Sequence, residues 1–153
     1  MMNNNDMKII ERLMTHGRAT WAELGAMLGL SAPAAADRVH RLEENGVIKG
    51  YSALINPEEI GCGLAAIIAI TLERAEVKPD FIHLMMNLAE VLECHHIAGA
   101  EDYMIKVRCS GTRDLERLIS EEIKSLPGVK TRTTVILSTV KETPILPIKT
   151  EGR

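Results

Sequence analysis

The strongest chemical signal in the chain is a cluster of basic side chains, Arg38, His40 and Arg41. Arginine side chains donate hydrogen bonds to phosphate oxygens and to guanine edges, which is the chemistry of DNA binding. Asp37 beside them is discordant, because a carboxylate is repelled by the DNA backbone. We expect Asp37 to pair with Arg41, four residues on, and to hold that side chain in place. The alternative is that both arginines are simply solvated.

A second cluster, Cys94, His95 and His96, has residue types suited to a nucleophile or a metal site. It lies in a strand-like run, where adjacent side chains point to opposite faces and cannot converge on one ion. The chain also lacks a G-x-S-x-G elbow, a phosphate-binding loop and an H-E-x-x-H helix. With Cys62 and Cys109 it has no C-x-x-C pair, which disfavours a disulfide framework and a zinc ribbon. We expect no enzyme activity, no metal site and no cofactor.

The composition is that of a globular protein, with 46% hydrophobic and 25% charged residues. The net charge of −3 excludes a wholly basic coat protein, but the neutral first third can still gather cations on one face. Aromatic residues make up only 3%, which disfavours a base-stacking RNA platform. The longest apolar run is too short to span a bilayer and the start lacks a signal peptide. We therefore expect a cytoplasmic protein without membrane contact.

Local helix signals position the cations. Residues 6–17 have helical periodicity, with Asp6 a plausible N-cap and Gly17 a plausible end. Thr20 and Glu23 form a T-x-x-E capping box, which predicts that a second helix starts there.

A third helix should follow after a tight turn. Gly29 adopts positive φ without penalty, Ser31 caps the helix, and Pro33 fits its first turn. Two helices joined in this way form a helix-turn-helix arrangement. The inward stripe is predicted to be Ala35, Val39 and Leu42.

The start of this third helix should enter the major groove, where small side chains let the backbone approach the base edges. The predicted DNA-binding residues are Thr20, Trp21, Ser31, Ala32, Pro33, Ala34, Asp37, Arg38 and Arg41.

The second half reads as strand, helix, strand, strand, helix, strand, which is the ferredoxin-like split order. Its helices should cover one face of a four-stranded sheet. We therefore predict an α+β protein. Its parts are a winged-helix-like, three-helix helix-turn-helix domain (1–50), a linker strand and hinge (51–63), and a ferredoxin-like βαββαβ sandwich (64–153).

The first strand of that sheet, residues 64–72, is apolar on both faces. A domain on its own would leave one face in water, and burying it against a partner gains roughly 25 cal/mol per Å² of apolar area. This pattern predicts a homodimer formed by sheet-to-sheet packing.

Several stretches together resemble the Lrp/AsnC, or feast/famine, transcriptional regulators. They are DMKIIERL, GRATWAELGAMLGLS, DRVHRLEENGVIKGY, INPEEIG, IAGAEDYMIKV, LPGVKTRTT and a closing LPI, and they run from Asp6 to about Ile148. The resemblance implies an ACT-like ligand-sensing (RAM) domain, dimers that associate into octamers, and control by an amino acid.

The resemblance also implies an effector pocket beside the loop between the second and third strands of the sensor domain. Here that loop is GAEDY, so the candidates are Gly99, Glu101, Asp102 and Tyr103, with Thr134 on the last strand a weaker candidate. Asp102 would receive the ligand ammonium, and Gly99 would allow a backbone approach.

One departure from the family is the run Ala34, Ala35 and Ala36, where members often carry polar or β-branched residues. Fewer donors there favour shape readout and wrapping of DNA by an oligomer over strong base readout. The function predicted is a sequence-preferring DNA-binding regulator whose assembly and DNA occupancy respond to a small effector. The alternative is a small-molecule sensor that acts on a partner protein.

Overall fold

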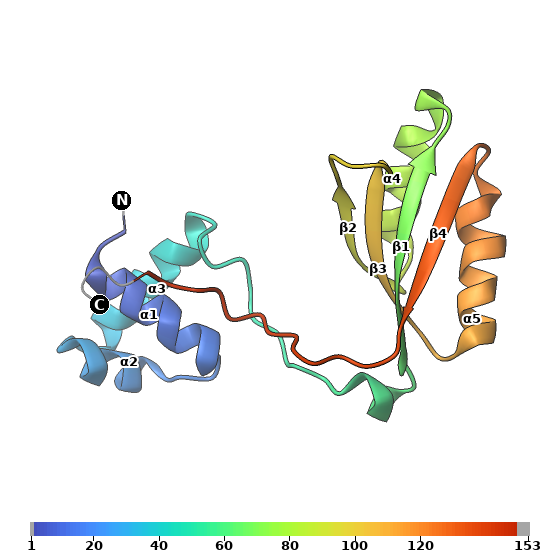
Figure 1. Cartoon of the computed structure of the whole chain (residues 1–153). Coiled ribbons are helices and arrows are strands. Elements are labelled where there is room, and N and C mark those ends of the chain that lie inside the picture. The colour runs from blue at the N-terminus through green and yellow to red at the C-terminus, as the bar shows by residue number, and fades with distance from the viewer. Residues whose placement is uncertain (1, 150–153) are drawn as a thin grey trace. The chain divides into compact units, whose positions relative to one another are not determined.

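The computed structural model describes residues 2–149, which form two compact units (Figure 1). The head comprises residues 2–54 with residues 141–149, and the sheet unit comprises residues 55–140. The C-terminal segment thus groups with the helices, although the sequence division placed it with the sensor domain. One contact of this segment is made by the Leu146 N–H, which lies 3.4 Å from the Met14 sulfur. Within residues 2–149 we find no helix with the length and apolar character needed to cross a bilayer.

Three helices build the head: α1 (Asn4–Thr15), α2 (Trp21–Leu28) and α3 (Ala32–Glu44). The N-cap of α1 is Asn3, so the prediction of Asp6 was wrong by three residues. The Asn3 side chain accepts a hydrogen bond from the Asp6 N–H at 2.9 Å, and the Asp6 carboxylate accepts one from the Asn3 N–H at 3.1 Å. Both residue types fit a cap, and here they share it reciprocally.

The predicted caps of α2 and α3 are confirmed. The Thr20 hydroxyl accepts from the Glu23 N–H at 3.1 Å, and the Glu23 carboxylate accepts from the Thr20 N–H at 3.3 Å. The Ser31 hydroxyl accepts from the Ala34 N–H at 3.2 Å. Between the two helices Gly29 has φ 69°, the left-handed conformation that the turn requires.

The head core lies where the apolar faces of the three helices meet. It consists of Ile9, Leu24, Ala35, Val39 and Leu42, which include the whole inward stripe predicted for α3. The turn crosses α2 at Gly25, where an added Cβ would lie only 2.6 Å from the Leu30 carbonyl oxygen. Glycine is therefore required at Gly25 by a close approach of two backbone segments.

The sheet unit confirms the predicted βαββαβ order. Its antiparallel strands are β1 (Leu64–Leu72), β2 (Val91–His96), β3 (Tyr103–Cys109) and β4 (Val129–Ile136), in the spatial order β2-β3-β1-β4. The helices are α4 (Lys78–Asn87) and α5 (Thr112–Arg117). A π-helical turn (Leu118–Glu122) and a 3-10 turn (Ile123–Ser125) continue α5.

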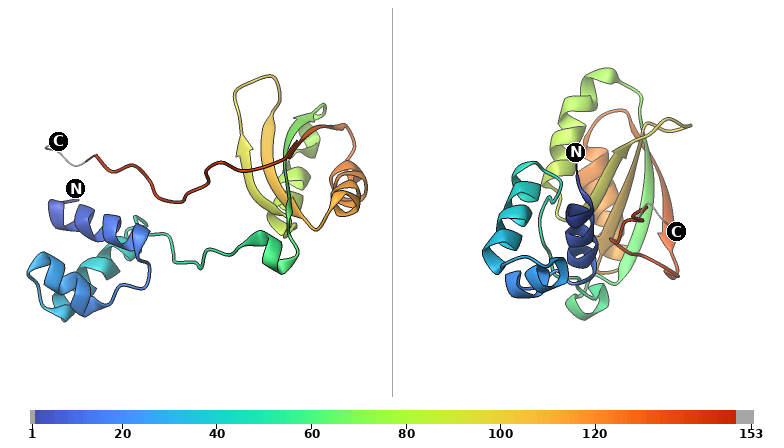
Figure 2. Two further views of the ribbon diagram at one scale, coloured as in Figure 1. Left: turned by 60° about the horizontal axis from the view of Figure 1, so that its bottom comes forward. Right: turned by 90° about the vertical axis from the view of Figure 1, so that its left-hand side faces the viewer.

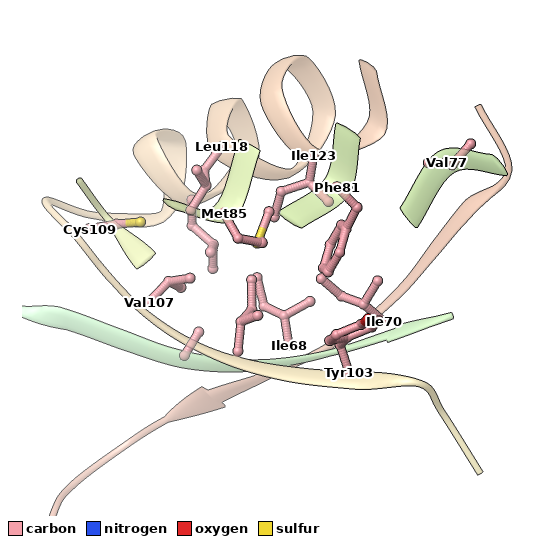
Figure 3. Packing of buried hydrophobic residues seen from close by; sticks show 13 residues of the cluster. Ile68, Ile70, Val77, Phe81, Met85, Tyr103, Val107, Cys109, Leu118 and Ile123 are labelled. Atoms are coloured by element: carbon pink, nitrogen blue, oxygen red, sulfur yellow. The ribbon is translucent and has the colours of Figure 1, made fainter. Parts of the chain in front are cut away.

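Both helices of the sheet unit cover the same face of the sheet (Figure 2). Phe81 and Met85 of α4, with Leu118 and Ile123 after α5, point down onto Ile68 and its neighbours on β1 and β3 (Figure 3). This packing fixes the strand register, because a shift by one residue would turn the apolar side chains to the other face.

The opposite face of β1 is less exposed than its sequence predicts. Ala65 and Ala69 are buried within this single chain. Ala65 pairs with Arg108 and Ile136, and Ala69 pairs with Met104 and Arg132. These longer cross-strand side chains flank the short alanine methyl groups. Between Ala65 and Ala69, only Ile67 is therefore half-buried, and the other residues of this stretch are buried.

Candidate nucleic-acid interface and effector site

The capped start of α3 lies on the surface of the head. Ser31, Pro33 and Asp37 are exposed, while Ala32 and Ala34 are half-buried. Of the three alanines that follow Pro33, Ala35 is fully buried in the core. The side chains available to DNA over the first turns of α3 are therefore small.

The two arginines of α3 have different surroundings. Arg38 Nη1 lies 3.5 Å from the Asp6 carboxylate and 3.4 Å from the Asn3 side-chain oxygen, so α1 holds it. Arg41 is exposed, and no ion pair joins it to Asp37 among residues 2–149. The prediction that Asp37 holds Arg41 was therefore wrong. The acidic partner comes from another helix and binds the other arginine.

Thr20 and Trp21 lie at the start of α2. The Thr20 hydroxyl is used as a helix cap, as described above, while Trp21 is 41% exposed. Trp21 meets the His40 ring edge-on, with 5.6 Å between ring centroids. The contact joins the start of α2 to the middle of α3 and places an aromatic side chain beside His40.

The predicted effector loop is tied to the end of β1 by Asp102. Its carboxylate accepts from the Leu72 N–H at 2.8 Å, and its own N–H donates to the Ile70 carbonyl at 2.9 Å. The Asp102 carbonyl accepts from the Ile97 N–H at 2.9 Å, which closes the loop. One carboxylate oxygen of Asp102 therefore has a structural partner.

Glu101 faces β4 and forms an ion pair with Arg132, whose Nε lies 2.8 Å from the carboxylate. Thr134 is exposed two residues further along β4, so it shares a face of the strand with Arg132. Gly99 is exposed, and an added Cβ would meet nothing within 4 Å. Sequence reasoning missed Arg132, because no local pattern links residues of β4 to this loop.

Tyr103 lies on the other side of the sheet from this group. Its side chain is 6% exposed and contacts the rings of Phe81 and His96, at centroid distances of 4.8 and 4.9 Å. The Tyr103 side chain is therefore part of the core that α4 covers.

The remaining cluster noted in the sequence does not bring its three side chains together. Cys94 pairs with Ile105 and His95 with Met104, so the two side chains alternate across β2. His95 Nε2 lies 3.0 Å from Glu93 on the same face. Within the part of the chain that the structure describes, no group of three potential ligands is close enough to hold a metal ion.

Comparison with known proteins assigns both units. Residues 2–43 match the model of the AsnC-type helix-turn-helix domain, and residues 65–146 match that of the Lrp/AsnC ligand binding domain. The chain belongs to the Lrp/AsnC family. It is therefore a helix-turn-helix transcriptional regulator and not an enzyme.

Relatives in this Lrp/AsnC family align over nearly the whole chain. The HTH-type transcriptional regulator LrpA of Mycobacterium tuberculosis is 40% identical, over 90% of this chain and 91% of its own length. The leucine-responsive regulatory protein of Escherichia coli K12 is 38% identical, over 95% and 90%.

Solved Lrp/AsnC structures share the fold. A transcriptional regulator of Neisseria meningitidis in complex with L-methionine has a TM-score of 0.90 at 28% identity, covering 96% of this chain and 97% of that one. The feast or famine regulatory protein of M. tuberculosis, also complexed with L-methionine, has a TM-score of 0.82 at 40% identity, covering 91% and 95%.

Proposed function

We propose that this regulator binds duplex DNA by placing the N-terminal half of α3 in the major groove. The observation that carries the proposal is the capped, exposed start of α3, which presents Ala32, Pro33 and Ala34 ahead of Arg38 and Arg41. Small side chains let the helix approach the bases, and the arginines then reach phosphates or guanine edges. Thr20, Trp21, Ser31 and Asp37 border this surface.

The test is the affinity of the full chain for DNA, measured by fluorescence anisotropy over a range of salt concentrations. Arg38→Ala and Arg41→Ala should each weaken binding on the order of tenfold at low salt and lower the salt slope by about 1. Lys124→Ala removes an equal charge from the sheet unit and is the matched control. If Lys124→Ala weakens binding as much as the arginine variants, the head is not the DNA surface.

The effector we propose is an amino acid bound beside the loop of residues 97–102. The methionine complexes of two relatives support this ligand class. An amino acid carries an ammonium and a carboxylate. The ammonium would donate to Asp102, and the carboxylate would accept from Arg132, whose guanidinium also pairs with Glu101. Gly99, Thr134 and the second oxygen of Asp102 would line the site, while Tyr103 would contribute its backbone only.

The regulator would work as an assembly in the cytoplasm, at the nucleoid. A homodimer through the helix-free face of the sheet would present two α3 helices to successive major grooves, about 34–36 Å apart. Association of dimers, up to an octamer, would let bound effector change DNA occupancy with a coupling of typically 1–3 kcal/mol. Exposed Leu54, Ile55, Leu137 and Val140 support a partner, because a single chain leaves these side chains in water.

A further inference from the structure

The capping residues of α1 reach across the head to the recognition helix. Asn3 and Asp6 hold each other in the capping box, and both also contact Arg38 Nη1, at 3.4 and 3.5 Å. The Asp6 side chain is 18% exposed and that of Arg38 is 27% exposed. Forming the first turn of α1 therefore places a carboxylate and an amide oxygen against one nitrogen of Arg38.

The donors that Arg38 needs for DNA stay available in this arrangement. A guanidinium has five N–H donors in a planar fork, and both contacts use Nη1 alone. Arg38 and Arg41 also line one hollow of about 460 Å³ between the start of α1 and α3, with Asp6 at its wall. Arg41 has no such anchor among the described residues.

We propose that Asn3 and Asp6 are positioning residues for Arg38, which fix its guanidinium for recognition of DNA. This role rests on the DNA contact proposed above for Arg38. Anchoring removes rotamer freedom from a long side chain before binding, so that contact costs less entropy and one geometry is favoured. In the opposite role, Asp6 would mask Arg38 from phosphate. Masking would require a guanidinium that is more enclosed than this one and whose remaining donors are also occupied.

The two roles predict opposite changes in discrimination between DNA sequences. The experiment measures the affinity of the full chain for its best duplex from a random-sequence selection and for a scrambled duplex of equal length. Asp6→Asn keeps an acceptor for the α1 cap but removes the charge, and Asn3→Ser keeps the cap but is too short to reach Arg38. Each should lower the ratio of the two affinities about fivefold.

Three controls separate positioning from other causes. Glu11→Gln removes an exposed charge from the same helix and should leave the ratio unchanged. Asp6→Glu keeps a carboxylate at this position, so its ratio of affinities should stay close to that of the wild type. In an Arg38→Ala background, Asp6→Asn should have no further effect, because the partner through which it acts is gone.

Positioning is overturned if Asp6→Asn tightens binding to both duplexes alike, if its effect persists without Arg38, or if the ratio does not change. Unfolding followed by fluorescence of Trp21, the only tryptophan, shows whether each head variant is folded. Wild-type protein that binds neither duplex contradicts the proposed function itself, and this inference with it. Wild-type binding with an unchanged ratio in the variants overturns this inference alone.

Discussion

At the scale of single residues, carboxylates singled out in the sequence also have partners that the sequence did not predict. Asp102, the candidate for a ligand ammonium, accepts the Leu72 N–H at the end of β1. Asp6, expected only to cap a helix, also contacts Arg38. Residue type therefore indicated which groups are important, whereas their contacts came from segments distant in the sequence.

Cys109 on β3 is predicted to make the sheet unit sensitive to alkaline pH. Burial raises the pKa of its thiol to about 11, and the nearby carboxylates of Asp114 and Glu90 act in the same direction. A raised pKa means that the folded state holds the proton more tightly than the unfolded state. The stabilising contribution is therefore complete below pH 9 and is lost between pH 9 and pH 11.

The measurement is urea unfolding followed by circular dichroism from pH 8 to 11. The wild type should lose stability over this range by on the order of 1–2 kcal/mol more than Cys109→Ala, which has no thiol to titrate. Parallel curves for the two proteins would show that Cys109 does not govern the response. Comparing the two slopes cancels the titration of the tyrosines and lysines, which both proteins share.

At the scale of elements, caps and turns determine how the helix-turn-helix forms. Two glycines are needed in it for different reasons. Gly29 is needed for its φ of 69°, and an added Cβ there would meet nothing within 4 Å. Gly25 has ordinary helical geometry but lies against the Leu30 carbonyl oxygen. The first requirement is local, and the second arises from the packing of the turn on α2.

We predict that Gly25→Ala destabilises the head more than Gly29→Ala. An added methyl group at Gly25 would force backbone apart and cost about 1–3 kcal/mol, while the strain of alanine at positive φ costs about 1 kcal/mol. Urea unfolding followed by Trp21 fluorescence reports on the head and checks the order. Equal midpoints for the two variants would show that separating α2 from the turn costs no more than the backbone strain at Gly29.

At the scale of the whole molecule, the chain enters and leaves the sheet unit between two segments of the head. The segment after β4 therefore returns to α1, where Leu146 meets Met14. A change at Arg132 or Thr134 on β4 is thus linked by a short stretch of chain to the DNA-binding unit.

Sedimentation should show a dimer or larger assembly at micromolar concentration, and the amino-acid effector found by screening all twenty should shift the assembly equilibrium by roughly 5- to 150-fold. Asp102→Asn keeps an acceptor for the Leu72 N–H and should abolish the response, since the ammonium loses its anion. Glu121→Gln removes an exposed carboxylate from the π-helical turn and should respond like the wild type. A monomer at this concentration would contradict the assembly, and calorimetry without heat for any of the twenty amino acids would contradict the sensing.

The sequence by itself determined the helices of the head, their caps at Thr20 and Ser31, and the turn at Gly29. It also determined the order in which strands and helices follow one another along the sheet unit. These features depend on residues a few positions apart, so their signals are local. Only the tertiary structure decided that Arg38 binds Asn3, that Asp102 binds Leu72 and that Arg132 binds Glu101, pairs 35, 30 and 31 residues apart. Such contacts depend on how distant segments dock. Docking is set by the burial of apolar faces, and many different polar pairings are compatible with the same burial.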